Sequence, residues 1–147
     1  MKHALALILC LAACVKAPTL PEVPIPLRNP TAPVASQVDA SLSRLRGDWL
    51  VVQGAGLVPG SRLVFGDKAV RIGGVALPLQ DKGQGRLLLG EEQLWVHWLD
   101  ADNRTAAMGN PEGTRVWIMD RTGKPGERLK AAREILEWYG YDLSRME

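Results

Sequence analysis

The sequence predicts an all-β fold: a small antiparallel up-and-down β-barrel of about eight strands, with a C-terminal α-helix packed outside it. From Asp48 onward, short runs of β-branched and bulky apolar residues follow one another, and each ends at Gly or Asp turn residues. Strands so close in sequence pair as hairpins, and about eight of them can close on themselves, which removes the edges of an open meander. A helical apolar pattern follows the last run.

The predicted strands are short, so the barrel is expected to be small. They lie at residues 48–53, 61–66, 68–73, 75–79, 85–89, 93–99, 103–108 and 114–119. At ~3.3 Å per residue, such strands span only ~16–23 Å. A barrel of this size either holds a narrow cavity or is filled by its own side chains.

The last predicted strand is apolar on both faces, with Val116 and Ile118 on one and Trp117 and Met119 on the other. A sheet with one face in water would alternate apolar and polar residues. One face is therefore expected to look into the core, and the other to be covered by the helix predicted from Glu127 to Tyr139. That helix carries one apolar stripe, formed by Leu129, Ala132, Leu136 and Tyr139.

The N-terminus has the plan of a signal peptide, predicted at residues 1–13. A short basic start precedes the apolar run from Ala4 to Leu9, which is far shorter than the ~20 residues of a membrane span. The ending Leu11-Ala12-Ala13-Cys14 is similar to bacterial lipoprotein signals, in which the cysteine is acylated and becomes the first mature residue. The alternative is an ordinary secretory signal cleaved nearby.

The next segment, residues 14–37, is predicted to be the lipidated Cys14 and a proline-rich tether, and the barrel and helix are assigned to residues 38–147. Six of the ten prolines lie in this tether, and their spacing favours extended chain. Its apolar residues leave two interpretations open, a plain semi-rigid spacer, which the composition favours, or contact with lipid or with the domain. These residues are Leu20, Val23, Ile25 and Leu27.

Charge and histidine content exclude several classes of function. The net charge is +2 with mixed signs along the chain, so no nucleic-acid partner is expected. His97 is the single histidine after the predicted signal, and a lone histidine cannot build a catalytic metal site. We therefore expect no metal, no cofactor and no enzymatic activity, with His97 packed in the fold or forming a polar spot in a cavity.

The strand from Leu94 to Leu99 offers the best wall for an apolar ligand. Simple alternation places Trp95 and Trp98 on opposite faces, so one of them should point into the barrel. The inward tryptophan, and His97, are candidate ligand contacts together with Leu87, Met108 and Trp117. Filling of the core accounts for the same residues equally well.

Several motifs, in order along the chain, resemble bacterial outer-membrane lipocalins. Gly47-Asp48-Trp49 is similar to the G-x-W of the family's first strand. The family's last three strands resemble three runs of this chain: Trp95 to Arg104, Met108-Gly109-Asn110-Pro111, and Trp117-Ile118-Met119-Asp120-Arg121-Thr122. The segment after the family's helix is similar to Gly140-Tyr141-Asp142. The resemblance covers roughly Leu45 to Met146, in a shortened form, and is poor between Val58 and Leu89.

This resemblance implies a structural pair and a function. In lipocalins the G-x-W tryptophan sits at the closed end of the barrel under an arginine, which here would place Arg121 across Trp49 beside Gly47; a core tryptophan and an unrelated surface arginine is the alternative. The implied function is binding or carrying a small hydrophobic molecule, such as a fatty acid or lysophospholipid. The implied place is the periplasmic face of the outer membrane, held by the lipid anchor.

Two other classes of function remain open. A structural or assembly lipoprotein with a filled barrel and an envelope protein as partner fits the short strands. A periplasmic protease inhibitor with a similar small barrel is the other, although the C-terminal helix and the W-I-x-x-R-T motif argue against it. A packed interior would favour the structural class, and an apolar pocket open near residues 54–60 would favour ligand binding.

Overall fold

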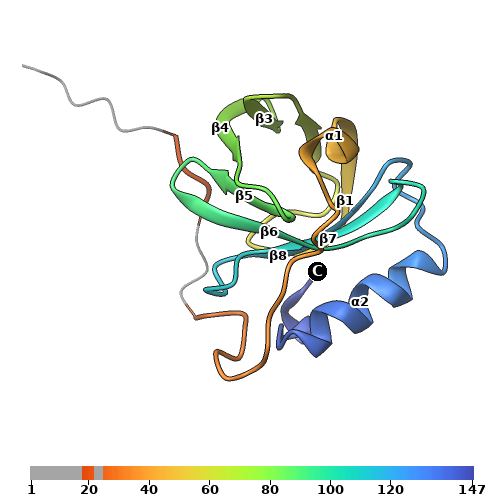
Figure 1. Ribbon diagram of the computed structural model, residues 1–147. Coiled ribbons are helices and arrows are strands. Elements are labelled where there is room, and N and C mark those ends of the chain that lie inside the picture. The colour runs from red at the N-terminus through yellow and green to blue at the C-terminus, as the bar shows by residue number, and fades with distance from the viewer. Residues whose placement is uncertain (1–17, 22–24) are drawn as a thin grey trace, which may run out of the picture.

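Eight consecutive antiparallel strands form a closed barrel in the computed structural model, which describes residues 18–21 and 25–147 (Figure 1). Each strand pairs with the next, and β8 returns to pair with β1, so the predicted barrel is confirmed. The strands are β1 (Gly47–Ala55), β2 (Arg62–Phe65), β3 (Ala69–Ile72), β4 (Val75–Asp81), β5 (Arg86–Leu89), β6 (Glu92–Leu99), β7 (Thr105–Gly109) and β8 (Val116–Asp120).

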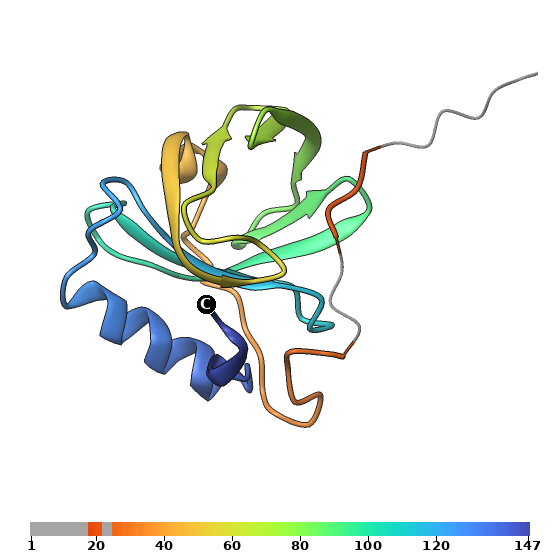
Figure 2. The ribbon, with the colours of Figure 1, turned by 180° about the vertical axis from the view of Figure 1, so that it is seen from behind.

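One long helix lies outside the barrel. This helix, α2 (Arg128–Trp138), runs beneath β6, β7 and β8, as Figure 2 shows from behind. The predicted helix is therefore confirmed, although it covers β6 and β7 as well as the last strand. The short helix α1 (Leu42–Leu45) precedes β1, and a 3-10 turn, η1 (Leu143–Arg145), follows α2. No helix among the described residues is long and apolar enough to cross a membrane.

The interior of the barrel is filled by its own side chains. A side chain beside a void large enough for water would expose area to that void. The larger interior side chains instead have exposures of 0%, namely Leu45, Trp49, Leu63, Val96, Met108, Trp117 and Met119. The most exposed members of this cluster lie at both ends of the barrel, with Leu42 and Ile72 at 7% and Leu57 at 8%. The barrel is therefore packed along its length.

A second apolar layer joins the barrel to α2. Val116 and Ile118 of β8 face outward and pack with Ala132 and Leu136 of the helix, while Trp117 belongs to the interior. The two apolar faces of β8 thus have the two partners that the sequence predicts.

The prediction that Trp95 and Trp98 lie on opposite faces is wrong. Strand β6 has a bulge at His97, since Val96 pairs with Met108 while Trp98 pairs with Ala107. The extra residue shifts the alternation, so both tryptophans lie outside the barrel, and Leu94, Val96 and Leu99 fill the interior instead.

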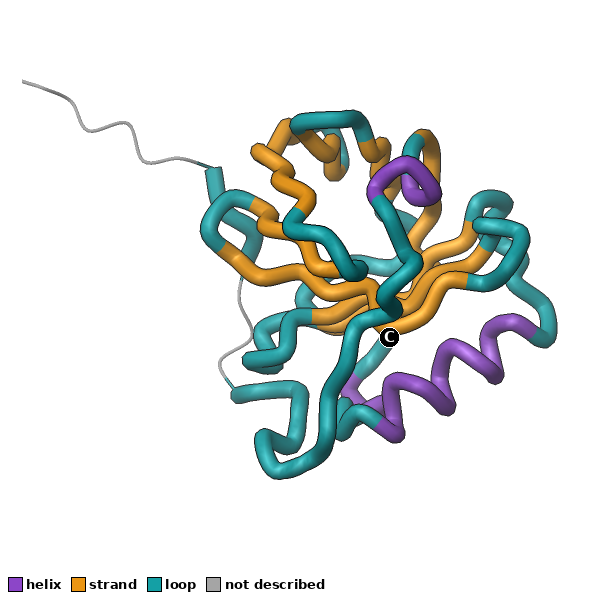
Figure 3. Tube along the Cα trace, in the orientation of Figure 1, coloured by secondary structure: helices purple, strands orange, loops and turns teal. Residues whose placement is uncertain are grey.

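The barrel has two distinct ends (Figure 3). The end covered by α1 includes the β6–β7 turn and Arg121, and we call it the closed end. The other end carries the loops at residues 56–61, 73–74, 90–91 and 110–115, and we call it the open end. Residues 18–21 run along this open end (Figure 1).

Part of the predicted tether belongs to the folded domain, which corrects the spacer interpretation for residues 25–37. Leu27 is buried against the outer apolar layer, and its amide donates to the carbonyl of Gly113 at 2.8 Å. Arg28 forms a β-bridge with Tyr141, and the amide of Gln37 donates to the carbonyl of Val96 in β6 at 2.8 Å. Proline spacing predicts extended chain correctly, but extended chain with apolar side chains can also pack on a barrel. The signal peptide and Cys14 lie outside the described residues.

Candidate functional site

At the closed end, Arg121 lies across Trp49 as the family resemblance implies. The guanidinium carbon is 3.7 Å from the centroid of the indole ring. Arg121 also donates to the carbonyls of Asn103 at 3.0 Å, Arg44 at 3.0 Å and Arg46 at 2.6 Å. Cation–π attraction and these bonds tie β1, α1 and the β6–β7 turn to the residue that follows β8, so this cluster closes the barrel and offers no ligand site.

The glycine of the G-x-W motif makes this approach possible. Gly47 has a φ of +94°, and a Cβ atom there would lie 3.3 Å from Nη1 of Arg121. Any other residue would be strained in this left-handed conformation and would crowd the guanidinium.

Asp120 supports the same end, and sequence reasoning did not single it out. Its carboxylate accepts bonds from the Thr105 hydroxyl at 2.7 Å and from the amide of Thr122 at 2.8 Å. Burial acts to raise the pKa of Asp120, but these hydrogen bonds outweigh it and hold the pKa below its usual value. The residue is therefore charged at neutral pH and organises the turn after β8.

His97 lines neither hollow and is packed in the fold, which is the first of the two roles that the sequence left open for it. It lies outside the barrel, 3% exposed, in the bulge of β6. Burial lowers the pKa of His97 to about 4, although the hydrogen bond to the Ala35 carbonyl acts to raise it. The ring is therefore neutral at pH 7. Nδ1 then donates to the Ala35 carbonyl at 2.7 Å, and Nε2 accepts from the Tyr141 hydroxyl at 2.7 Å. His97 therefore joins the N-terminal segment, β6 and the C-terminal segment.

Gly109 leaves the space that this connection needs. A Cβ atom at this position would collide with the Tyr141 hydroxyl and would lie 3.0 Å from Nε2 of His97. The Tyr141 hydroxyl also lies 3.0 Å from the carbonyl oxygen of Asn110, and burial raises its pKa well above the usual value. Neither ring is placed for proton transfer to a bound molecule.

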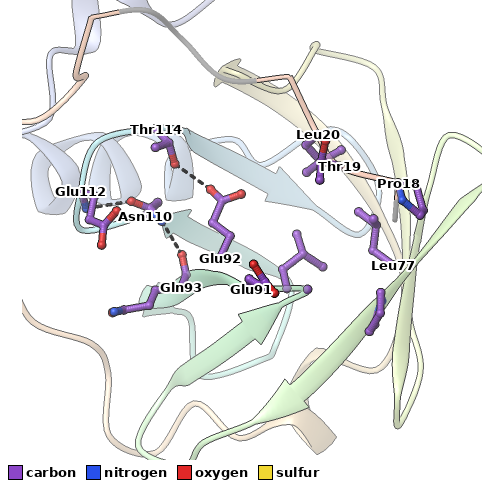
Figure 4. Close-up of a pocket in the computed structure, with 13 residues that line it drawn as sticks. Pro18, Thr19, Leu20, Leu77, Glu91, Glu92, Gln93, Asn110, Glu112 and Thr114 are labelled. Atoms are coloured by element: carbon purple, nitrogen blue, oxygen red, sulfur yellow. Dashed lines mark hydrogen bonds between the residues drawn. The ribbon is translucent and has the colours of Figure 1, made fainter. Parts of the chain in front are cut away.

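A hollow of about 490 Å³ opens at the open end and is the candidate ligand site (Figure 4). Its apolar wall is formed by Leu77 and Pro78 of β4 and Leu89 of β5, with Leu20 of the N-terminal segment closing it from above. The opposite wall is polar and includes Glu91, Glu92, Gln93, Asn110, Glu112 and Thr114. One side of this hollow thus suits an apolar group, and the other suits water or a polar head.

A second hollow, of about 440 Å³, lies on the other side of the same segment. It is lined by Leu57 and Val58 of the β1–β2 loop and by Leu27. Leu20 lines both hollows, so the N-terminal segment divides the open end into two parts.

The polar wall is acidic, and Arg115, a buried cation behind it, is already paired. Arg115 is 1% exposed, and its Nε donates to Glu92 at 2.7 Å. Thr114 donates to the same carboxylate at 2.6 Å. Glu91 and Glu112 are exposed at the rim. The first hollow therefore presents negative charge, with no lysine or arginine among its described lining residues.

The predicted ligand contacts are only partly where the sequence placed them. Leu87, Met108 and Trp117 do face the interior, but they are packed against neighbouring side chains below the hollows. Trp95 lies outside under Arg86, whose guanidinium carbon is 4.1 Å from the ring centroid, and Trp98 packs on the outer layer. The leucines that line the open end were missed, because their hollow depends on how separate loops meet.

In the described ranges, 18–21 and 25–147, no group of three or more His, Cys, Asp or Glu side chains is placed to hold a metal ion.

Comparison with known proteins agrees with the fold. A search of the curated proteins found no match. The family model described as a lipocalin-like domain matches residues 84–147, from the turn before β5 to the C-terminus. This match covers the strands and helix that carry the C-terminal motifs, and the closed eight-stranded barrel with its outer helix extends the agreement to the first strands. The C-terminal part of the chain, residues 84–147, is therefore similar to a lipocalin-like domain, which bears out the resemblance to the lipocalin family.

Proposed function

We propose that this protein binds a small hydrophobic ligand at the open end of its barrel and that it acts by binding rather than catalysis. The observation that carries this proposal is the apolar wall of Leu77, Pro78 and Leu89 at the open end of a lipocalin-like barrel. Since the interior below is filled, the ligand lies in the hollow with its polar end toward the acidic rim. An acyl chain there gains dispersion contacts and loses contact with water.

The acidic wall argues for a particular kind of head group. A fatty acid would bring its carboxylate next to Glu91 and Glu112, and Arg115 is already engaged by Glu92. Like charges at close range oppose binding. A neutral lipid, or a lysophospholipid with an amine in its head group, avoids this repulsion. We therefore propose a neutral or amine-bearing lipid as the ligand, in preference to a free fatty acid.

Titration of the mature chain carrying Cys14→Ser tests this proposal, because that chain has no attached lipid. A monoacylglycerol is expected to bind saturably, near one per barrel, with a Kd in the micromolar range, equivalent to about −8 kcal/mol. Ligand-dependent stabilisation should also raise the Tm. A fatty acid of the same chain length should bind more weakly. The double substitution Glu91→Gln and Glu112→Gln should reduce the difference in Kd between the two lipids. Equal affinity of the starting protein for both lipids would contradict the role of the acidic wall.

A second candidate function is that of a structural or assembly protein whose barrel serves only as a stable core. The specific observation in its favour is the filled interior around Trp49, Met108 and Trp117. Absence of any saturable signal or Tm shift with either lipid, below the concentration at which it forms micelles, would favour this function over ligand binding.

We also propose that Cys14 is acylated and anchors the protein to the periplasmic face of the outer membrane. The support is the sequence Leu11-Ala12-Ala13-Cys14 after a short apolar run. Two or more acyl chains give stable attachment, at ~0.8 kcal/mol for each buried CH₂. In a Gram-negative host, the wild type is expected in the detergent phase with the intact mass of a lipidated chain, and Cys14→Ser is expected to lose both properties. A wild type that is soluble and carries no lipid would refute the anchor.

A further inference from the structure

We infer that residues Pro18–Pro21 form a plug that competes with ligand for the open end of the barrel. This inference rests on the proposed binding function, and it adds a regulatory element within the same chain. Leu20 packs on the interior apolar cluster between the two hollows, where it narrows the opening available to the apolar part of a ligand.

The plug contacts the core directly through one side chain. Leu20 is partly buried and packs against the interior apolar cluster, while Pro18, Thr19 and Pro21 are exposed. Figure 4 shows Leu20 above the hollow, opposite the polar side chains of Glu92 and Asn110. Because Leu20 lines both hollows, its withdrawal would join the spaces of about 490 and 440 Å³ into one larger opening.

Among the described residues, one hydrogen bond holds the plug, and its donor is a residue that is also fixed by other partners. Nη1 of Arg115 donates to the carbonyl of Pro21 at 2.9 Å. The same guanidinium is held by the carbonyl of Gly56 at 2.9 Å and by Glu92 at 2.7 Å. When the plug leaves, Arg115 keeps these two partners, so release does not dismantle the open end.

The position of the plug in the chain favours reversible closure. Pro18 and Pro21 restrict the backbone on either side of Leu20, which lowers the conformational entropy lost when the plug docks. Residues 25–37 are fixed on the domain, so the plug stays close to the opening at a high effective concentration. One leucine side chain gives only a modest contact, which a longer acyl chain can replace.

The test uses the mature chain with Cys14→Ser and a neutral fluorescent apolar probe, N-phenyl-1-naphthylamine. Leu20→Ser removes most of the apolar contact of the plug and is expected to lower the Kd for the probe about 10-fold. Leu20→Met keeps an apolar plug of similar size and should retain the wild-type Kd. Ile25→Ser is the matched control, since Ile25 is 66% exposed and lies outside both hollows. It should also leave the Kd unchanged.

The outcomes separate the plug from the binding function. Saturable binding by the wild type with an equal or higher Kd in Leu20→Ser overturns the plug and leaves the proposed function standing, with Leu20 as part of the ligand wall. Binding by neither protein overturns both. A Kd that falls equally in Leu20→Ser and Ile25→Ser also overturns the plug, because the effect would then reflect general loosening of the segment. An unchanged Tm of Leu20→Ser without probe shows that the domain is still folded.

Discussion

Replacement of Trp49 by alanine is expected to lower the free energy of unfolding by about 3–5 kcal/mol, which for a domain of this size removes a large part of its stability. The indole is fully buried, and its Nε1 donates to the Leu45 carbonyl at 2.6 Å. The substitution therefore creates a cavity at the closed end, breaks the bond to α1 and removes the ring beneath Arg121. Urea denaturation followed by circular dichroism measures the change.

The same experiment resolves the contribution of the arginine. Arg121→Ala is expected to cost about 1–2 kcal/mol, through loss of the cation–π contact and of hydrogen bonds to four backbone carbonyls. A double-mutant cycle should show coupling, since the arginine has no ring to cover once Trp49 is gone. Arg62→Ala is the control, because its ion pair with Asp48 is exposed and such pairs contribute about 0–1 kcal/mol. Additive single effects at Trp49 and Arg121 would show that their contact adds no stability.

Leu136→Asp is expected to unfold the domain or to lower its stability by at least about 4 kcal/mol. Leu136 is fully buried between α2 and the outer faces of β7 and β8, beside Ala107 and Ile118. Loss of a buried leucine costs about 2–5 kcal/mol, and burial of an unpaired carboxylate adds to this. Thermal denaturation, with intrinsic fluorescence as the readout, measures the effect.

Trp138→Asp provides the matched control on the same helix. Trp138 is 72% exposed, so the same new charge there should change the stability by only about 0.5 kcal/mol. If Leu136→Asp melted at the wild-type temperature, α2 would be an appendage that contributes nothing to the barrel.

The strands, the helix and the closed end were predictable because each depends on local or motif-level information. Gly and Asp residues mark the turns, and the apolar stripe of α2 is regular. The bulge at His97 was not predictable. It changes which residues of β6 face the interior, and the apolar side chains of this strand are compatible with either face. The packing of Leu27 was missed for a different reason: a proline-rich segment has the same composition whether it docks or remains a spacer. The open end depends on residues from four loops and the N-terminal segment, so no local pattern reveals it.

The contact between residues 27–28 and the C-terminal segment has a consequence for the order of folding. Nε of Arg28 donates to the carbonyl of Tyr139 across 111 positions of sequence, and the amide of Asp142 donates to the carbonyl of Leu27. The barrel itself closes only when β8 reaches β1. Both closures connect the beginning of the domain to its end, so the hairpins from β2 to β7 can form early while the final fold waits for the last residues. Contacts of such long sequence separation make folding slow, because the entropy of a large loop is lost before the contacts form. A nascent chain of this protein therefore stays incomplete until its C-terminal turn has emerged.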